Sequence, residues 1–214
     1  KFPATFFYLE ISGKKILIDT GYSASLGRGK GATAKFYSLA TKAKCEKDAD
    51  VVLAENGINP EEIEYIIISH FHPDHYGSLS KFPKALIICS NDAAELLTEG
   101  RTAKRIIKME SYPDIKLFQD SDSSENNFFD ILNLNEIYGF YLDGHARGHI
   151  GLYLKKLNKL MVFDALWSKE NLDSAEPRKI LKKIALSDEK KYEKSKNIIK
   201  EILLCLKNTG NVET

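Results

Sequence analysis

Residues 69–75 read Ser-His-Phe-His-Pro-Asp-His, and they hold three of the five histidines of this 214-residue chain. Histidine is the commonest metal ligand in proteins, and aspartate is a usual companion for a divalent ion. His70 and His72 alternate, so both rings leave an extended segment on the same side. A proline then favours a chain reversal before Asp74 and His75. The segment therefore predicts ligands for two metal ions that lie a few ångströms apart.

The other two histidines lie close together in the stretch Gly-His-Ala-Arg-Gly-His, residues 144–149. Ordinary loop histidines are the alternative explanation for both clusters, but three histidines and an aspartate within six residues favour a metal site. With that cluster present, His145 is expected to be a further ligand. His149 is expected to support the loop or to donate a hydrogen bond to a ligand.

The candidate groups follow predicted strands. Asp19, His70, His145 and Asp164 come at or just after the ends of apolar segments over residues 15–19, 65–69, 137–142 and 160–163. Loops at the carboxyl ends of strands converge on one edge of a sheet, where functional groups gather. Asp19 alone is also typical of a turn before Thr20-Gly21, and Asp164 alone is an ordinary acid at a strand end.

The remaining pattern mixes strands with helices, which predicts one α/β or α+β domain over residues 1–214. Further strands are expected at 5–12, 85–89 and 150–155, around turns at Ser12-Gly13 and Asn158. Helices are expected at 34–43, 48–56, 91–99, 176–186 and 188–207, and a loop at 120–127. Ser90 or Asn91 is expected to cap the third of these helices.

Composition excludes several classes of protein. Lys and Arg number 31 and Asp and Glu 30, so the net charge of +1 favours neither nucleic acid nor an anionic membrane as a partner. No apolar run approaches 18 residues, and no signal peptide is evident at the start. Three separated cysteines without a CxxC pair are typical of a reducing compartment, which predicts a cytoplasmic location. The expected partner is a small-molecule substrate.

Residues 70–75 match the HxHxDH motif, and the chain resembles the metallo-β-lactamase superfamily of metallohydrolases. Asp19-Thr20-Gly21, the GHxxGH stretch at 144–149 and Asp164 match supporting motifs in the same order, and the resemblance spans residues 5–167. Within the superfamily, the chain is most similar to the lactonase and glyoxalase-II-like proteins. The resemblance implies a four-layer αββα sandwich, in which two mixed β-sheets face each other with helices outside.

The resemblance also implies a role for each ligand. His70, His72 and His145 hold the first metal, Asp74 and His75 hold the second, and Asp164 bridges both. The cofactor expected is zinc, as two divalent ions, although the same ligands accept iron, manganese or cobalt. The family usually supplies another histidine from a late strand, and no histidine follows His149. We therefore expect a weaker second site here, and a natural chain that continues beyond Thr214 with that histidine and is trimmed at its N-terminal end.

These ligands predict a metal-dependent hydrolase of a small ester, lactone or thioester. The nucleophile is a metal-bridging hydroxide, and Asp74 positions that water and protonates the leaving group. The substrate pocket is expected between residues 23–47 and 99–114, with walls that include Phe36, Tyr37, Arg101, Arg105 and Tyr112.

Three alternative functions remain open. An iron-dependent redox enzyme uses the same fold with oxygen. A nucleic-acid hydrolase of the superfamily needs a basic surface or an added domain, which charge and length do not offer. A metal-containing ligand-binding protein with little turnover is favoured only by the missing histidine.

Overall fold

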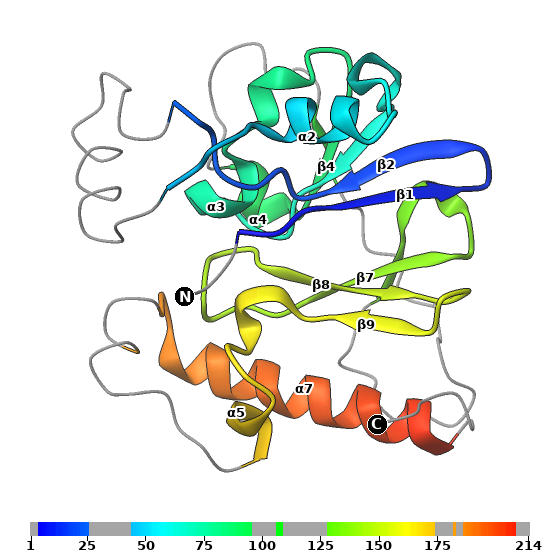
Figure 1. Ribbon diagram of the computed structural model, residues 1–214. Coiled ribbons are helices and arrows are strands. Elements are labelled where there is room, and N and C mark those ends of the chain that lie inside the picture. The colour runs from blue at the N-terminus through cyan, green and yellow to red at the C-terminus, as the bar shows by residue number, and fades with distance from the viewer. Residues whose placement is uncertain are drawn as a thin grey trace. The chain divides into compact units, whose positions relative to one another are not determined.

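The computed structural model describes residues 4–25, 44–95, 106–108, 128–173, 182 and 186–208 (Figure 1). The chain divides into a first unit, residues 1–88 and 97–107, and a second unit, residues 89–96 and 108–214. Strands and helices occur together in both units, which confirms the expected α/β class. That residues 1–214 form a single domain stays a prediction.

The first sheet has five strands in the order of the chain. An antiparallel hairpin opens the sheet, and its turn is made by Ser12 and Gly13, both with positive φ, as the sequence predicts. Strands β2, β3 and β4 are parallel, with Ile16 beside Tyr65 and Tyr65 beside Leu86. The five strands are β1 (Phe7–Ile11), β2 (Lys14–Ile18), β3 (Tyr65–Ile67), β4 (Leu86–Cys89) and β5 (Ile106–Lys108).

Isoleucine and leucine residues in the parallel strands form the core of this unit. Ile16, Leu17, Ile18, Ile66, Ile67 and Ile87 have no exposed surface. Continuous apolar runs of this kind are typical of parallel strands that are covered on both faces. Among its described residues, the helices of this unit are α2 (Ala49–Glu55), η1 (Pro60–Glu62), α3 (Pro73–Tyr76) and η2 (Leu79–Lys81).

The second unit is built on a four-stranded antiparallel sheet. Its strands are β6 (Phe128–Asp130), β7 (Ile137–Tyr141), β8 (Ile150–Leu154) and β9 (Lys159–Met161). The 20-residue helix α7 (Glu189–Asn208) runs along this sheet (Figure 1). Ile199, Ile202 and Leu206 of α7 pack with Phe140 and Tyr153 in one buried cluster. The apolar face predicted for this helix is therefore its contact with the sheet.

The described part of the second unit also contains short helices. Ser90 accepts a hydrogen bond from the amide of Ala93 at 3.1 Å, which confirms a predicted cap. These helices are α4 (Asn91–Ala94), η4 (Ile131–Asn133), η5 (Phe163–Ala165) and α5 (Glu170–Asp173).

The structure shifts several predicted strand boundaries by one or two residues, and one of these shifts moves a candidate ligand. The last strand ends at Met161, not at Phe163, because Phe163 has φ of 47° and begins the helical turn η5. A left-handed backbone cannot continue a strand. Asp164 therefore lies in η5 rather than at the strand end. Strands β5 and β6 and helix α3 were not predicted from the sequence.

Three predicted elements fall largely or wholly outside the described residues. They are the helices at 34–43 and 176–186 and the loop at 120–127. All three cysteines are free thiols. Within the part of the chain that the structure describes, no helix has the length and apolarity needed to cross a membrane.

Candidate metal centre

The first histidine cluster follows strand β3 in the first unit. His72 is extended, with φ of −96° and ψ of 148°, and it immediately precedes helix α3. Pro73 occupies the first helical turn, where its missing N–H is tolerated. Asp74 and His75 lie on α3, so the chain turns after the proline as the sequence predicts.

Three imidazole rings come together in this unit. The centroid of the His70 ring is 4.6 Å from that of His72 and 4.1 Å from that of His75. A ligand nitrogen of His70 lies within 4.8 Å of one from each of the other two rings. His70 and His75 are buried, and His72 is half-buried. Nitrogen donors at this spacing fit divalent ions bound at about 2.0–2.1 Å.

Asp19 fixes the orientation of His75. Its Oδ2 lies 2.7 Å from Nδ1 of His75, although 56 positions separate the two residues. Asp19 follows β2 directly, with φ of 57°, and its amide donates to the carbonyl of Ile67. With Nδ1 donating to this carboxylate, Nε2 is the nitrogen of His75 that could bind a metal ion. The Asp19 carboxylate therefore lies on the Nδ1 side of the His75 ring, within the first unit.

Ser69 contacts several of the candidate residues, and the sequence did not single it out. Its amide and its hydroxyl donate to the two carboxylate oxygens of Asp19, both at 2.8 Å. The same hydroxyl oxygen lies 3.1 Å from Nδ1 of His70 and 3.3 Å from Nδ1 of His75. The feature of the sequence that could have pointed to Ser69 is its position directly before the histidine motif. Ser69 therefore links the orientation of His70 to that of His75.

The Asp19 carboxylate is almost inaccessible to solvent, with 1% of its surface exposed. Burial raises the pKa of this carboxyl, whereas the donors from His75 and Ser69 act to lower it. Asp74 is more accessible, with 23% of its side chain exposed and Oδ2 3.7 Å from Nε2 of His75. Of the two acids, Asp74 is the one that can meet a small molecule.

The second unit contains the other predicted ligands. Nε2 of His145 lies 3.3 Å from Oδ2 of Asp164, close enough for one ion to contact both. Helical turn η5 places Asp164 there. The His149 ring lies 6.0 Å from that of His145 and 6.3 Å from Phe163, and it is completely buried. The expected support of the loop by His149 stays a prediction.

A pair of stacked aromatic rings, Trp167 and Tyr192, lies beside His145 in the same unit. The ring of Trp167 is 6.1 Å from that of His145, edge to face, and stacks on Tyr192 at 6.0 Å. Neither aromatic residue was singled out from the sequence, since a lone aromatic residue in an amphipathic pattern is ordinary core. The His145 side chain itself is buried, with 5% of the residue exposed.

The structure thus brings together His70, His72, Asp74 and His75 in the first unit, and His145 and Asp164 in the second. The assignment of all six residues to one centre stays a prediction. The aromatic and basic residues expected to line the substrate pocket, Phe36, Tyr37, Arg101, Arg105 and Tyr112, lie outside the described residues.

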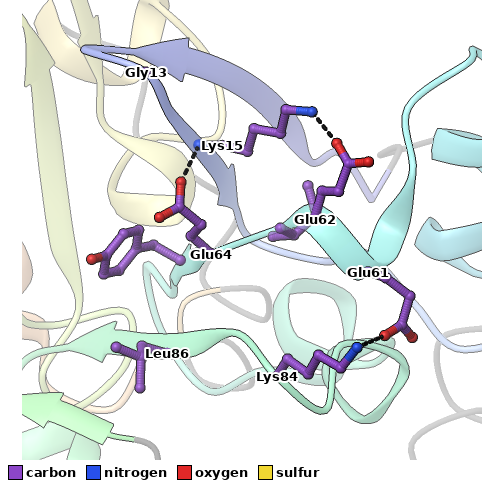
Figure 2. A pocket seen from close by; sticks show the side chains of 9 residues that line it. Gly13, Lys15, Glu61, Glu62, Glu64, Lys84 and Leu86 are labelled. Atoms are coloured by element: carbon purple, nitrogen blue, oxygen red, sulfur yellow. Dashed lines mark hydrogen bonds and ion pairs between the residues drawn. The ribbon is translucent and has the colours of Figure 1, made fainter.

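A hollow of about 490 Å³ lies elsewhere in the first unit (Figure 2). Tyr65 and Leu86, at the amino ends of β3 and β4, line it, so it lies at the opposite end of β3 from His70. Its charged groups are paired: Lys84 contacts Glu61 at 2.6 Å, and Lys15 contacts Glu62 (Figure 2). None of the predicted ligands lines this hollow, and we do not assign it a role in the chemistry.

The sequence of the chain matches the profile of one protein family. The sequence profile of the Metallo-beta-lactamase superfamily matches residues 1–201. The chain is 24% identical over 181 residues to the N-acyl homoserine lactonase AttM of Rhizobium radiobacter, covering 78% of this chain and 66% of AttM. It is 26% identical over 183 residues to the N-acyl homoserine lactonase AiiA of Bacillus thuringiensis subsp. kurstaki, covering 82% of this chain and 68% of AiiA. The chain therefore spans about two thirds of the length of these relatives.

A solved structure shows the same fold. It is that of an N-acyl homoserine lactone hydrolase with the product N-hexanoyl-L-homoserine bound at its catalytic metal centre. It aligns with a TM-score of 0.63 and 22% identity, covering 92% of this chain and 74% of the other. This likeness confirms the fold expected from the histidine motif.

Proposed function

Because the chain belongs to the metallo-β-lactamase superfamily, we propose that it is a metal-dependent hydrolase that opens the ester bond of a small lactone. The observation that carries this proposal is the cluster of His70, His72 and His75, with Asp19 holding Nδ1 of His75 at 2.7 Å. A buried carboxylate behind an imidazole is the usual support of a metal-ligating histidine. The lactonase relatives favour a cyclic ester among the carbonyl substrates.

The proposed ligands are those expected from the motif. His70, His72 and His145 would hold one ion, and Asp74 and His75 would hold a second, with Asp164 as a ligand common to the two sites. The donor set fits zinc, which is bound by imidazole nitrogen and carboxylate oxygen in catalytic sites. The 3.3 Å separation between His145 Nε2 and Asp164 Oδ2 supports their sharing an ion. Iron or manganese would use the same donors.

Divalent ions held by these residues would lower the pKa of a water molecule and supply positive charge to the developing oxyanion. The residues of the chain do the rest. Asp74, at 23% side-chain exposure, orients the attacking water and returns a proton to the leaving alkoxide. Asp19 and Ser69 keep His70 and His75 in fixed orientations. Fixed ligands need no reorganisation during the reaction, which is the source of their effect on rate.

Metal analysis followed by a substrate panel tests the proposal. Protein produced without added metal is analysed for zinc, iron and manganese, and then assayed with a homoserine lactone, a thioester and a phosphodiester. We expect lactone opening that is lost on chelation and restored by Zn²⁺. Preference for the thioester or the phosphodiester would contradict the lactone assignment. Oxygen consumption with bound iron, or metal binding without turnover of any substrate, would contradict hydrolysis.

A further inference from the structure

The loop that carries His145 is closed by the residue two positions before it. Oδ1 of Asp143 accepts a hydrogen bond from the amide of Gly148 at 2.8 Å. Gly148 has φ of 71°, a left-handed conformation that glycine adopts without strain. The carboxylate therefore spans the turn from its first residue to its last, with His145 between them.

Helix α7 packs against the same loop. The carbonyl of Gly144 accepts from the amides of Ser187 and Asp188, at 2.8 and 3.0 Å. Gly144 has φ of 123°, and a Cβ there would lie 2.8 Å from the backbone carbon of Lys191 and still closer to the backbone of Tyr192. Only a residue without a side chain allows the helix this close.

Asp143 joins these two sets of contacts. Its second carboxylate oxygen lies 3.2 Å from Nζ of Lys191, and its carbonyl accepts from the hydroxyl of Ser195 at 2.6 Å. The Asp143 side chain is 22% exposed and that of Lys191 is 54% exposed. The ion pair therefore contributes little by itself, and the contact with the Gly148 amide is the one that shapes the loop.

We infer that Asp143 is a positioning residue for His145: it holds the turn 143–148 in the shape that aims the imidazole at the metal. This role rests on the proposed function, in which His145 is a ligand. Loosening the loop would raise the entropy lost when His145 binds an ion, so the metal affinity would fall. The carboxylate acts through backbone geometry and touches neither the metal nor the substrate.

The chain offers a matched control in the same unit. The carboxylate of Asp130 accepts from the amide of Asn135 at 3.0 Å, which is also a carboxylate contact to an amide five residues later. Asp130→Ala removes the same kind of contact from a different turn. Lys191→Met removes only the exposed ion pair of Asp143.

Hydrogen exchange on the metal-free protein tests the loop without reference to activity. We expect Asp143→Ala to lose protection at the Gly148 amide, and Asp143→Asn, which keeps an acceptor oxygen, to retain it. Asp130→Ala should leave the Gly148 amide unchanged. Equal protection in wild type and Asp143→Ala would show that the carboxylate does not hold the turn, and would overturn the inference.

Zinc affinity, measured by competition with a chelator, then tests the consequence. We expect affinity to fall about 10–100-fold in Asp143→Ala and to change less than about threefold in Asp143→Asn, Lys191→Met and Asp130→Ala. If Asp143→Ala does not fold, Asp143→Glu, with its acceptor displaced by one methylene, should weaken zinc binding in a folded protein. Wild-type zinc affinity in Asp143→Ala, or in Asp143→Glu where Asp143→Ala does not fold, would overturn the inference while leaving the proposed function intact. If the wild-type protein binds no zinc, both the inference about Asp143 and the proposed function are contradicted.

Discussion

Asp19 and His75 are 56 positions apart in the sequence, and Oδ2 of the first lies 2.7 Å from Nδ1 of the second. The parallel pairing of β2 with β3 produces this contact. Ile18 is opposite Ile67, so the residue that follows β2 lies beside the segment that begins the histidine motif. The sheet thereby fixes which nitrogen of His75 faces a ligand.

Asp19→Asn should weaken metal binding about 10–100-fold. The amide side chain keeps the shape of the carboxylate but loses the charge that favours the Nδ1–H form of His75. Zinc affinity by chelator competition is the measurement, with circular dichroism to show that the fold is kept. Ser69→Ala, which leaves the contact between Asp19 and His75 in place, should have a smaller effect. Unaltered zinc affinity in Asp19→Asn would contradict this role.

His72→Ala should abolish activity and lower the metal content by about one ion. A site reduced from three imidazoles to two binds a divalent ion far more weakly. His149→Ala is the matched control, because it removes an imidazole that is expected not to ligate, and it should retain metal. Elemental analysis of both proteins decides the question. Wild-type stoichiometry in His72→Ala would refute its assignment as a ligand.

Asp74→Asn should keep the fold and lose most turnover. If the carboxyl protonates the leaving group, substrates with poor leaving groups should lose more activity than those with good ones. Rates for an aliphatic lactone and for an activated aryl ester, measured with metal-saturated protein, give the comparison. An equal loss for both substrates would mean that Asp74 only holds metal.

Asp48 should make the stability of the first unit depend on pH. Burial acts to raise the pKa of its carboxyl, but hydrogen bonds from the Ala24 amide at 2.7 Å and from Lys81 outweigh burial, so the pKa is lowered. A lowered pKa adds stability that is present above the unfolded value of about 3.9 and is lost as the pH falls through the folded value. Asp48→Asn should therefore be less stable than wild type at pH 6, by about 1 kcal/mol.

Denaturant unfolding of metal-free protein between pH 6 and pH 2.5 measures this difference. The difference in unfolding free energy between wild type and Asp48→Asn should become smaller as the pH falls below about 4. Glu55→Gln, which removes an exposed ion pair with Lys47, should change stability little at any pH. A gap that is constant with pH would exclude the titration of Asp48 as its source.

Gly148→Ala should destabilise the second unit more than Gly13→Ala destabilises the first. Both glycines have φ near 70°, so alanine introduces the same backbone strain, about 1–2 kcal/mol, at either position. A Cβ on Gly13 would meet nothing within 4 Å, whereas one on Gly148 would lie 2.5 Å from the Ala93 amide and closer to Ser90 Oγ. Denaturant unfolding compares the two variants. Equal losses of stability would show that the segment at Ala93 can move away.

The local sequence was sufficient to predict strands and a helix cap, because these features depend mainly on residues that are close together in the chain. Apolar runs predicted the strands at Tyr65 and Leu86. The residue types at Ser90 and Asn91 predicted a helix cap at one of the two, and the structure places it at Ser90. The error at Phe163 arose because an apolar residue after a strand gives no sign of a left-handed backbone. Strand β6 has only three residues, too few for a period of two to be recognised.

The sequence by itself determined the chemistry: the residue types in the motif at 70–75, their spacing, and the family that shares them. Tertiary structure alone decided which residues hold those ligands in place. No local sequence pattern reveals three of these residues. They are Ser69, which contacts Asp19 and the first histidine cluster, Tyr192, which packs against Gly144, and Asp143, which closes the second histidine loop. Their partners lie one to more than fifty positions away, and strand register and helix packing select them. Hydrogen bonds of this kind depend on distance in space, which a linear pattern does not contain.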